Sequence, residues 1–200
     1  HDAALWHPAQ ALIWPWHVHR LKPAVSAPPP PKRDALALWR QHCAHLLAEP
    51  SSFANVLQLT ACARDALQAC GMQRILVLLA DRTHTRLQVQ QAAGLDASAA
   101  SLSLDPTQSQ VLRRLLDAPG QLRLTPGNVA QFSALLPGNL KALFPSEHLL
   151  LRSVANNGRV VMLVVADQGG QPLNDVCLQA FGKTVQCIER ALGCFSRRGR

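Results

Sequence analysis

The chain of 200 residues contains no tyrosine, few charged side chains and no long uninterrupted apolar segment. Asp, Glu, Lys and Arg make up only 16% of it, whereas 48% of its residues are hydrophobic. No apolar run approaches the ~20 residues that a membrane-spanning helix needs, so we expect no membrane association. A chain of this length and apolar content can bury one substantial core, which predicts one globular domain with appended segments.

The motifs of common enzyme classes are also missing. We find no H-E-x-x-H or G-x-S-x-G motif, and Gly169-Gly170 is not followed by the Lys of a phosphate-binding loop. The pairs His42/His45 and His17/His19 have spacings that could serve zinc, but no second ligand pair follows at a usual distance. We therefore interpret these histidines as exposed, and predict a protein that is not an enzyme and holds no metal or cofactor.

The net charge of +8 and the pI of about 9.8 make nucleic acid the first partner to consider. The excess charge collects at the C-terminus, at Arg197, Arg198 and Arg200. No basic stripe follows a helical pattern, and no aromatic residues interleave with the basic ones. We interpret 197–200 as a solvated basic tail, with weak nucleic-acid binding through it as an alternative.

The six cysteines form no C-x-x-C pair, and most occupy apolar positions of helical patterns. This indicates reduced, buried thiols in a cytoplasmic protein. Cys62 and Cys70 fall on one expected helix, and Cys187 and Cys194 on another. If both helices pack on one face of a sheet, thiols could approach each other, so a thiol-based redox sensor or a Cys/His enzyme is a second hypothesis.

Residues 1–33 differ from the rest of the chain. They hold three of the four tryptophans and end in the tetraproline Pro28–Pro31, which is typical of a semi-rigid polyproline linker. The chain begins without a Met, so we expect a piece of a longer protein, with 1–33 as the tail of an upstream module. The main domain then covers 34–196.

Apolar periodicity and turn residues predict the elements of this domain. Asp34 is a candidate N-cap of the first helix and Ser51 or Ser52 of the second, whose face begins at Phe53. Asn157-Gly158 suits a two-residue hairpin turn because both positions need a positive φ, and Asn174 can cap the last helix. Helices are expected at 34–48, 51–70, 107–116, 128–136 and 174–195, and strands at 75–79, 86–90, 101–104, 122–124, 148–155 and 160–166. The result is an α+β fold, an antiparallel sheet of five to six strands with helices on both faces.

The closing part of the chain has a strand, a turn, a second strand and a helix start in close succession. These are Leu149–Val154, Asn156-Asn157-Gly158, the apolar Val160–Asp167 and Leu173-Asn174-Asp175. This succession resembles the end of a GAF domain, and the resemblance extends over 34–192. PAS-like sensor domains share parts of the pattern. The Trp/His-rich start is also similar to the tail of bacterial HDOD-domain signalling proteins, some of which carry a GAF-like domain. The resemblance implies a non-catalytic signalling domain that binds a small molecule or a protein partner and modulates an attached module.

The resemblance also implies candidate site residues. The sequence has no cyclic-nucleotide signature and no cysteine matching the bilin attachment site of phytochromes. A GAF-like pocket would lie between the sheet and the middle helices, 107–116 and 128–143. An anionic ligand could meet arginines there, against an apolar wall; the candidates are Arg86, Arg114, Arg152, Phe132 and Leu135. The first and last helices would form a homodimer and transmit the signal, through Trp39, Leu46, Phe181, Val185, Ile188 and Leu192.

Overall fold

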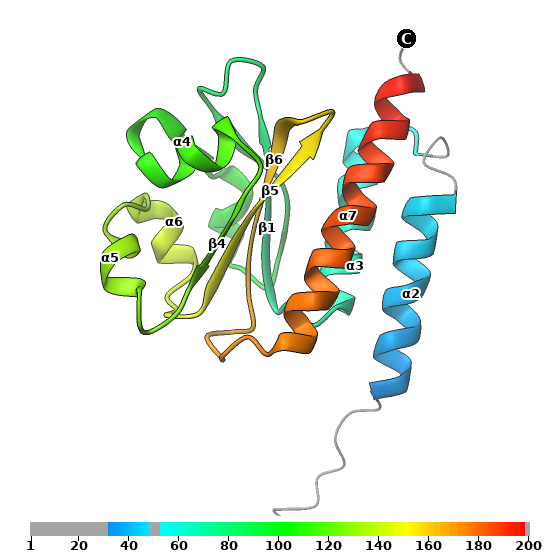
Figure 1. The fold of residues 1–200 in the computed structure, drawn as a ribbon, viewed down its shortest axis with the longest axis horizontal. Coiled ribbons are helices and arrows are strands. Elements are labelled where there is room, and N and C mark those ends of the chain that lie inside the picture. The colour runs from blue at the N-terminus through cyan, green and yellow to red at the C-terminus, as the bar shows by residue number, and fades with distance from the viewer. Residues whose placement is uncertain (1–31, 49–52, 199–200) are drawn as a thin grey trace, which may run out of the picture. The chain divides into compact units, whose positions relative to one another are not determined.

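The computed structural model describes residues 32–48 and 53–198. The chain divides after Asp34 into two units, and the fold described below is that of the second, Ala35–Arg200. Its framework is one antiparallel sheet of six strands in the order β3-β2-β1-β6-β5-β4 (Figure 1). The strands are β1 (Arg74–Ala80), β2 (Leu87–Ala93), β3 (Ser103–Leu104), β4 (Gln121–Leu124), β5 (Leu149–Asn156) and β6 (Arg159–Asp167).

Helices cover both faces of this sheet, as Figure 1 shows. One face carries α3 (Val56–Ala69) and α7 (Asp175–Arg198), with α2 (Lys32–Ala48) alongside α7. The other face carries α4 (Gln110–Asp117), α5 (Val129–Ser133) and α6 (Gly138–Leu143). The short 3-10 helices η2 (Ala97–Ser101) and η3 (Pro106–Gln108) flank β3. The predicted α+β fold class is thereby confirmed.

The two central strands separate two apolar cores. Along β6, Val164 and Ala166 face α3 and α7, whereas Leu163 and Val165 face the α4 side. β1 alternates in the same way, because successive side chains of a strand point to opposite faces. All four β6 residues are fully buried, which explains why the predicted strands 75–79 and 160–166 are apolar on both sides.

The turn predicted at Asn157-Gly158 and the helix cap predicted at Asn174 are confirmed. Asn157 and Gly158 join β5 to β6 with φ values of 53° and 77°, the left-handed region that such a turn requires. Asn174 caps α7, since its Oδ1 accepts a hydrogen bond from the Cys177 amide at 2.7 Å.

Several helix boundaries differ from the expectation. Ser51 and Ser52 lie outside the described residues, and the cap of α3 is Asn55, whose Oδ1 accepts from the Gln58 amide at 2.9 Å. Phe53 precedes this helix and is buried in the core. Asp34 lies within α2 instead of at its cap, and α7 continues through Arg198, so the expected boundary at 197 falls inside a helix.

Asn128 is also not a helix cap by its side chain. Its Oδ1 accepts from the Thr125 amide at 2.7 Å and its Nδ2 donates to the Arg123 carbonyl at 2.9 Å. The amide thus closes the turn after β4. The helix expected at 128–136 is shorter in the structure, where it is α5. It ends before Pro137, as expected, and α6 follows as a separate helix.

An ion pair between a partly exposed arginine and a buried carboxylate closes the opposite end of the central strands. Asp167, at the end of β6, is fully buried and accepts from Arg74 Nε at 2.8 Å and from Arg74 Nη2 at 2.5 Å. The hydrogen bond to Asp167 raises the pKa of Arg74. The same carboxylate accepts from the Gly169 amide at 3.0 Å, so the pair also positions the loop that leads to α7.

The turn between β1 and β2 is organised by one carboxylate. Asp81 accepts hydrogen bonds from the hydroxyl and amide of Thr85, from the Arg86 amide and from the Thr83 hydroxyl. These bonds, the Thr85 hydroxyl first, lower the pKa of Asp81 to about 2. His84, with φ of 56°, places its Nε2 2.8 Å from the carbonyl oxygen of Val160.

Asp81 should give the protein a specific acid sensitivity. Its native pKa lies below the ordinary value of 3.8, so the ionised form stabilises the fold, fully above pH ~4 and progressively less as the pH falls towards 2. Urea denaturation of the wild type and Asp81→Ala should therefore show a stability difference at pH 6 that shrinks at pH 2. A difference that is the same at both pH values would contradict this role.

The second prediction concerns the core under α7. Phe181 is fully buried there, so Phe181→Ala should lower the free energy of unfolding by about 3–5 kcal/mol. Val176, on the same helix, is 77% exposed, and Val176→Ala should change stability by no more than about 0.5 kcal/mol. Urea denaturation followed by circular dichroism measures both. Equal effects of the two substitutions would show that α7 is not anchored by this stripe.

Candidate ligand-binding groove

The space between the sheet and the middle helices is packed with apolar side chains. Leucines from the strands and from α4 and α6 meet there without solvent exposure: Leu76, Leu78, Leu112, Leu140, Leu151 and Leu163. These side chains form one apolar core between the layers. The candidate binding site on this side lies at the edge of that core.

A groove of about 680 Å³ lies at this edge. One wall is the segment 103–110, which contains β3 and η3, and the other is the connection 134–139 between α5 and α6. Its volume falls in the ~300–1,000 Å³ range of small-molecule sites. The lining residues are Ser103, Leu104, Asp105, Gln108, Gln110, Ala134, Leu135, Leu136, Pro137, Gly138 and Asn139.

The groove combines an apolar floor with neutral polar groups. Leu104 and Leu136 are almost fully buried, whereas Gln108 and Asn139 offer exposed carboxamides. Asp105 is the one charged side chain among the lining residues. Hydrogen bonds from the Thr107 hydroxyl and amide, with a smaller effect of Arg86, lower the pKa of Asp105, so it is ionised at neutral pH. The lining residues include no Lys, Arg, His or Cys.

A buried serine holds the two walls together. Ser109 Oγ donates to the carbonyl oxygen of Leu135 at 2.7 Å and accepts from the Leu112 amide at 3.3 Å. The first bond ties the 103–110 segment to the α5–α6 connection, and the second caps α4. The width of the groove is therefore set by a side chain that is 3% exposed.

The structure does not bring the five predicted pocket residues together. Leu135 lines the groove, and the partly buried Phe132 packs on the core beneath it. Arg86 and Arg114 are exposed and line no part of the groove. Arg152 donates to Gln121 Oε1 at 3.1 Å. It shares its face of β5 with Leu150 and Val154, so alternation places it on the α7 side of the sheet.

The predicted dimer residues lie mostly in the core of the single domain. Leu46, Phe181, Val185 and Ile188 are fully buried, and Leu192 is 6% exposed. Trp39 is partly exposed and donates from Nε1 to Thr184 Oγ1 at 2.8 Å. The apolar stripe of α7 is thus covered by the sheet, α3 and α2, and cannot serve a partner. A homodimer stays a prediction, and would have to use exposed residues such as Leu36, Leu38 and Leu47.

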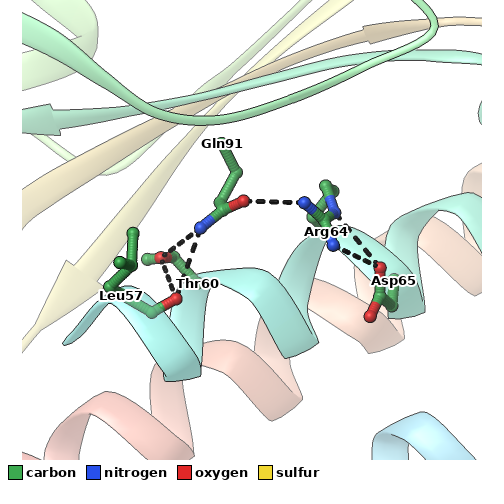
Figure 2. A network of polar contacts seen from close by, with 5 residues as sticks. All are labelled: Leu57, Thr60, Arg64, Asp65 and Gln91. Atoms are coloured by element: carbon green, nitrogen blue, oxygen red, sulfur yellow. Dashed lines mark hydrogen bonds and ion pairs between the residues drawn. The ribbon is translucent and has the colours of Figure 1, made fainter. Parts of the chain in front are cut away.

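Two polar clusters on the other face have structural explanations. Arg64 Nη1 donates to Gln91 Oε1 at 2.8 Å, and Gln91 Nε2 donates to the Leu57 carbonyl at 3.3 Å, which joins α3 to β2 (Figure 2). His42 and His45 line an open cleft of about 510 Å³ together with Cys62 and Asp65. Nevertheless, no three His, Cys, Asp or Glu side chains in the described part of the chain are placed to hold a metal ion.

None of the helices in residues 32–48 and 53–198 has the length and apolarity to cross a membrane.

Comparisons with known proteins identify the fold. No protein-family model matches the sequence, and no curated protein matches it significantly. Among solved structures, residues 122 to 287 of a methyl-accepting chemotaxis protein superpose with a TM-score of 0.64 at 15% identity, covering 76% of this chain and 98% of that one. The phycoerythrobilin-bound GAF domain of a cyanobacterial phytochrome gives 0.61 at 12%, covering 81% and 98%.

An enzyme shares the fold as well. Free methionine-R-sulfoxide reductase from Neisseria meningitidis, solved with its substrate, gives a TM-score of 0.57 at 16% identity, covering 82% of this chain and 93% of that one. The described domain therefore has the fold of a GAF domain, as the sequence predicts. At such identities the likeness establishes the fold alone.

Apart from Leu135, the residues that line the groove were not predicted from the sequence. Its polar residues Gln108, Gln110 and Asn139 stand in short segments far apart in the chain, without a motif. The available signal was the pair of breaks at Asp105-Pro106 and Pro137-Gly138, since chain breaks next to a sheet edge commonly carry binding loops.

Removing the hydroxyl that joins the two walls should destabilise the groove. Ser109→Ala leaves the Leu135 carbonyl and the Leu112 amide without their partner, which should cost about 1–3 kcal/mol in the free energy of unfolding. Ser103→Ala, an exposed lining position, is the matched control and should have little effect. Urea denaturation provides the measurement, and equal stabilities of the two variants would argue against this role of Ser109.

Proposed function

We propose that this domain is a non-catalytic regulatory domain that binds a small molecule in the groove between 103–110 and 134–139 and modulates an attached module. The observation that carries the proposal is the lining, which combines an apolar floor with three carboxamides and the Ser103 hydroxyl, and in which Asp105 is the one candidate general base. Asp105 is an unsuitable base at neutral pH, because its lowered pKa makes it a poor proton acceptor.

The lining also favours a class of ligand. Asp105 is ionised and no cationic side chain lines the groove, so an anionic ligand would be repelled. Gln108, Gln110 and Asn139 can donate and accept hydrogen bonds, and Leu104 and Leu136 offer apolar contact. A neutral or cationic molecule with an apolar part and an amide, amine or hydroxyl group fits best. The candidate arginines Arg86, Arg114 and Arg152 do not line this groove, so the proposal does not include an anion bound by them.

A chain of hydrogen bonds offers a route from the groove to the terminal helices. Ser109 caps α4, and the Ser153 hydroxyl on β5 donates to the carbonyl of Leu115 in the same helix. Ala155 lies two residues after Ser153 on β5, and its amide donates to Glu189 Oε2 on α7 at 3.3 Å. A ligand that draws the groove walls together would thus act on α4, β5 and α7 in turn.

Two of the structural neighbours suggest different functions for this fold, ligand binding and a reductase activity. The phytochrome GAF domain binds phycoerythrobilin, and the Neisseria protein is a reductase. In this chain all six cysteines stand on α2, on α3 and its C-cap, or on α7, none among the groove lining. A reductase reaction in the groove is therefore the less favoured function. An HDOD module before Asp34, a cytoplasmic location and a homodimer belong to the proposal as well.

A charge series of one side chain tests the ligand class. Leucinamide, N-acetylleucinamide and N-acetylleucine present the same apolar group as a cation, a neutral amide and an anion. The first two should shift the amide NMR signals of 103–110 and 134–139, whereas the anion should bind at least about tenfold more weakly, which corresponds to ~1.4 kcal/mol.

A blocking variant distinguishes the groove from other surfaces. A side-chain atom added at Gly138 meets nothing within 4 Å, so Gly138→Trp should fold and should abolish binding by occupying the groove. Gly127→Trp, at an exposed turn outside the groove, is the matched control and should bind normally. Tightest binding by the anion, or binding that survives Gly138→Trp, would contradict the proposal.

A further inference from the structure

The contact between α2 and α7 has a regular register. The two helices run side by side in the same direction (Figure 1), and Trp39 bonds to Thr184 across their interface. One turn further along each helix stand Cys43 and Cys187, and one more turn brings Leu47 and Arg190 to a common groove. Because residues three or four apart share a helix face, this register places the Cys43 and Cys187 side chains opposite each other.

The two thiols share a small cleft. Cys43 and Cys187 line a cavity of about 250 Å³ between the helices, together with Trp39, Lys183, Gln186 and Arg190. Cys43 is 9% exposed, whereas Cys187 is more exposed. A water molecule occupies only ~30 Å³ in the liquid, so the cleft can admit water or a small oxidant.

Helix geometry permits a bond between them. Axes of packed helices lie ~8–10 Å apart and Cα atoms lie ~2.3 Å from the axis, so directly facing Cα atoms approach to ~4–6 Å. Disulfides span Cα separations of ~4.4–6.8 Å. In this protein the two thiols line one cleft, and Cys187 acts on the Cys43 thiol through a side-chain hydrogen bond, so a cross-helix disulfide needs only a local approach of the two backbones.

The other cysteines are less suited to this chemistry. Cys62 lines a separate cleft that has no second thiol among its lining residues. Burial raises the pKa of Cys62 to about 11 and that of Cys70 to about 12, so neither supplies the attacking thiolate at neutral pH. Cys70 faces Cys177, whose pKa is likewise raised by burial. Cys194 is exposed, with its Sγ 3.6 Å from Arg197 Nη2, but its groove is lined by no second thiol among the described residues.

We propose that Cys43 and Cys187 are a redox-modification site, which peroxide converts to a disulfide that fastens α2 to α7. The groove on the opposite face of the sheet takes no part, so the site does not depend on the proposed ligand. Oxidation would thus fasten the first helix of the described domain to its last.

The reaction balances in two steps. The Cys187 thiolate, the more accessible sulfur, attacks one peroxide oxygen; the S–O bond forms, the O–O bond breaks, and hydroxide leaves to become water. The Cys43 sulfur then gives up its proton and attacks the Cys187 sulfenic acid, so that the S–S bond forms and a second water leaves. Burial, followed by the neighbouring Cys187, raises the pKa of Cys43 to about 11, which slows its direct reaction with peroxide and leaves it the resolving role.

The test uses the full chain with Cys194→Ser, which removes the exposed thiol. After hydrogen peroxide treatment, non-reducing peptide mapping should find Cys43 linked to Cys187, and dithiothreitol should reverse the link. Facing thiols have an effective concentration of at least ~1 mM, so at ~10 µM protein the internal link should exceed intermolecular links by about 100-fold. Hydrogen exchange along α2 should slow in the oxidised protein.

Two further variants assign the roles. In Cys43→Ser, Cys187 should accumulate a sulfenic acid that dimedone traps, whereas Cys187→Ser should leave Cys43 reduced. Cys62→Ser is the matched control, since Cys62 is also a half-buried thiol of this face, and it should keep the link. The proposal is overturned if Cys70–Cys177 or intermolecular links form as readily, if the link appears only in urea, or if α2 exchanges as fast after oxidation.

Discussion

The fold depends on the alternation of side chains along the central strand pair, β1 and β6. Each of these strands supplies both cores, since its odd and even residues face different helical layers. A shift of one residue in the pairing would exchange the two sets and place every side chain on the wrong face. The register is secured at one end by the Arg74–Asp167 pair and at the other by the contact of His84 with the Val160 carbonyl.

This arrangement leaves the two layers unequal. The α3/α7 layer is built from long helices, whose apolar side chains pack against the sheet and against each other. The α4–α6 layer consists of short helices joined by non-helical segments. Short helices have little stability of their own and depend on packing and caps. The groove lies at the edge of this layer, between two non-helical segments. The Ser109 hydroxyl, not a continuous helix, holds these segments together.

Sequence reasoning succeeded where the determinants were local. The strand 75–79, the Asn157-Gly158 turn and the Asn174 cap follow from residues that act within a few positions of themselves. It failed where a side chain's surroundings depend on a distant segment. The stripe of α7 looks the same whether it packs on its own sheet or on a partner, and Arg152 could be assigned to a face only after α7 had been placed. The groove belongs to the same class, because its walls are more than twenty residues apart.

The interface between α2 and α7 permits few alternative registers of the two helices. Thr184 Oγ1 accepts from Trp39 and donates to the Ala180 carbonyl at 2.7 Å, so its single proton is committed to α7 and a lone pair is used by α2. Sliding α2 along α7 would have to proceed by about one helical turn, ~5.4 Å, to restore a comparable fit. It would also separate Cys43 from Cys187. The register of α2 is therefore a discrete state, and a covalent link between these two cysteines would select it.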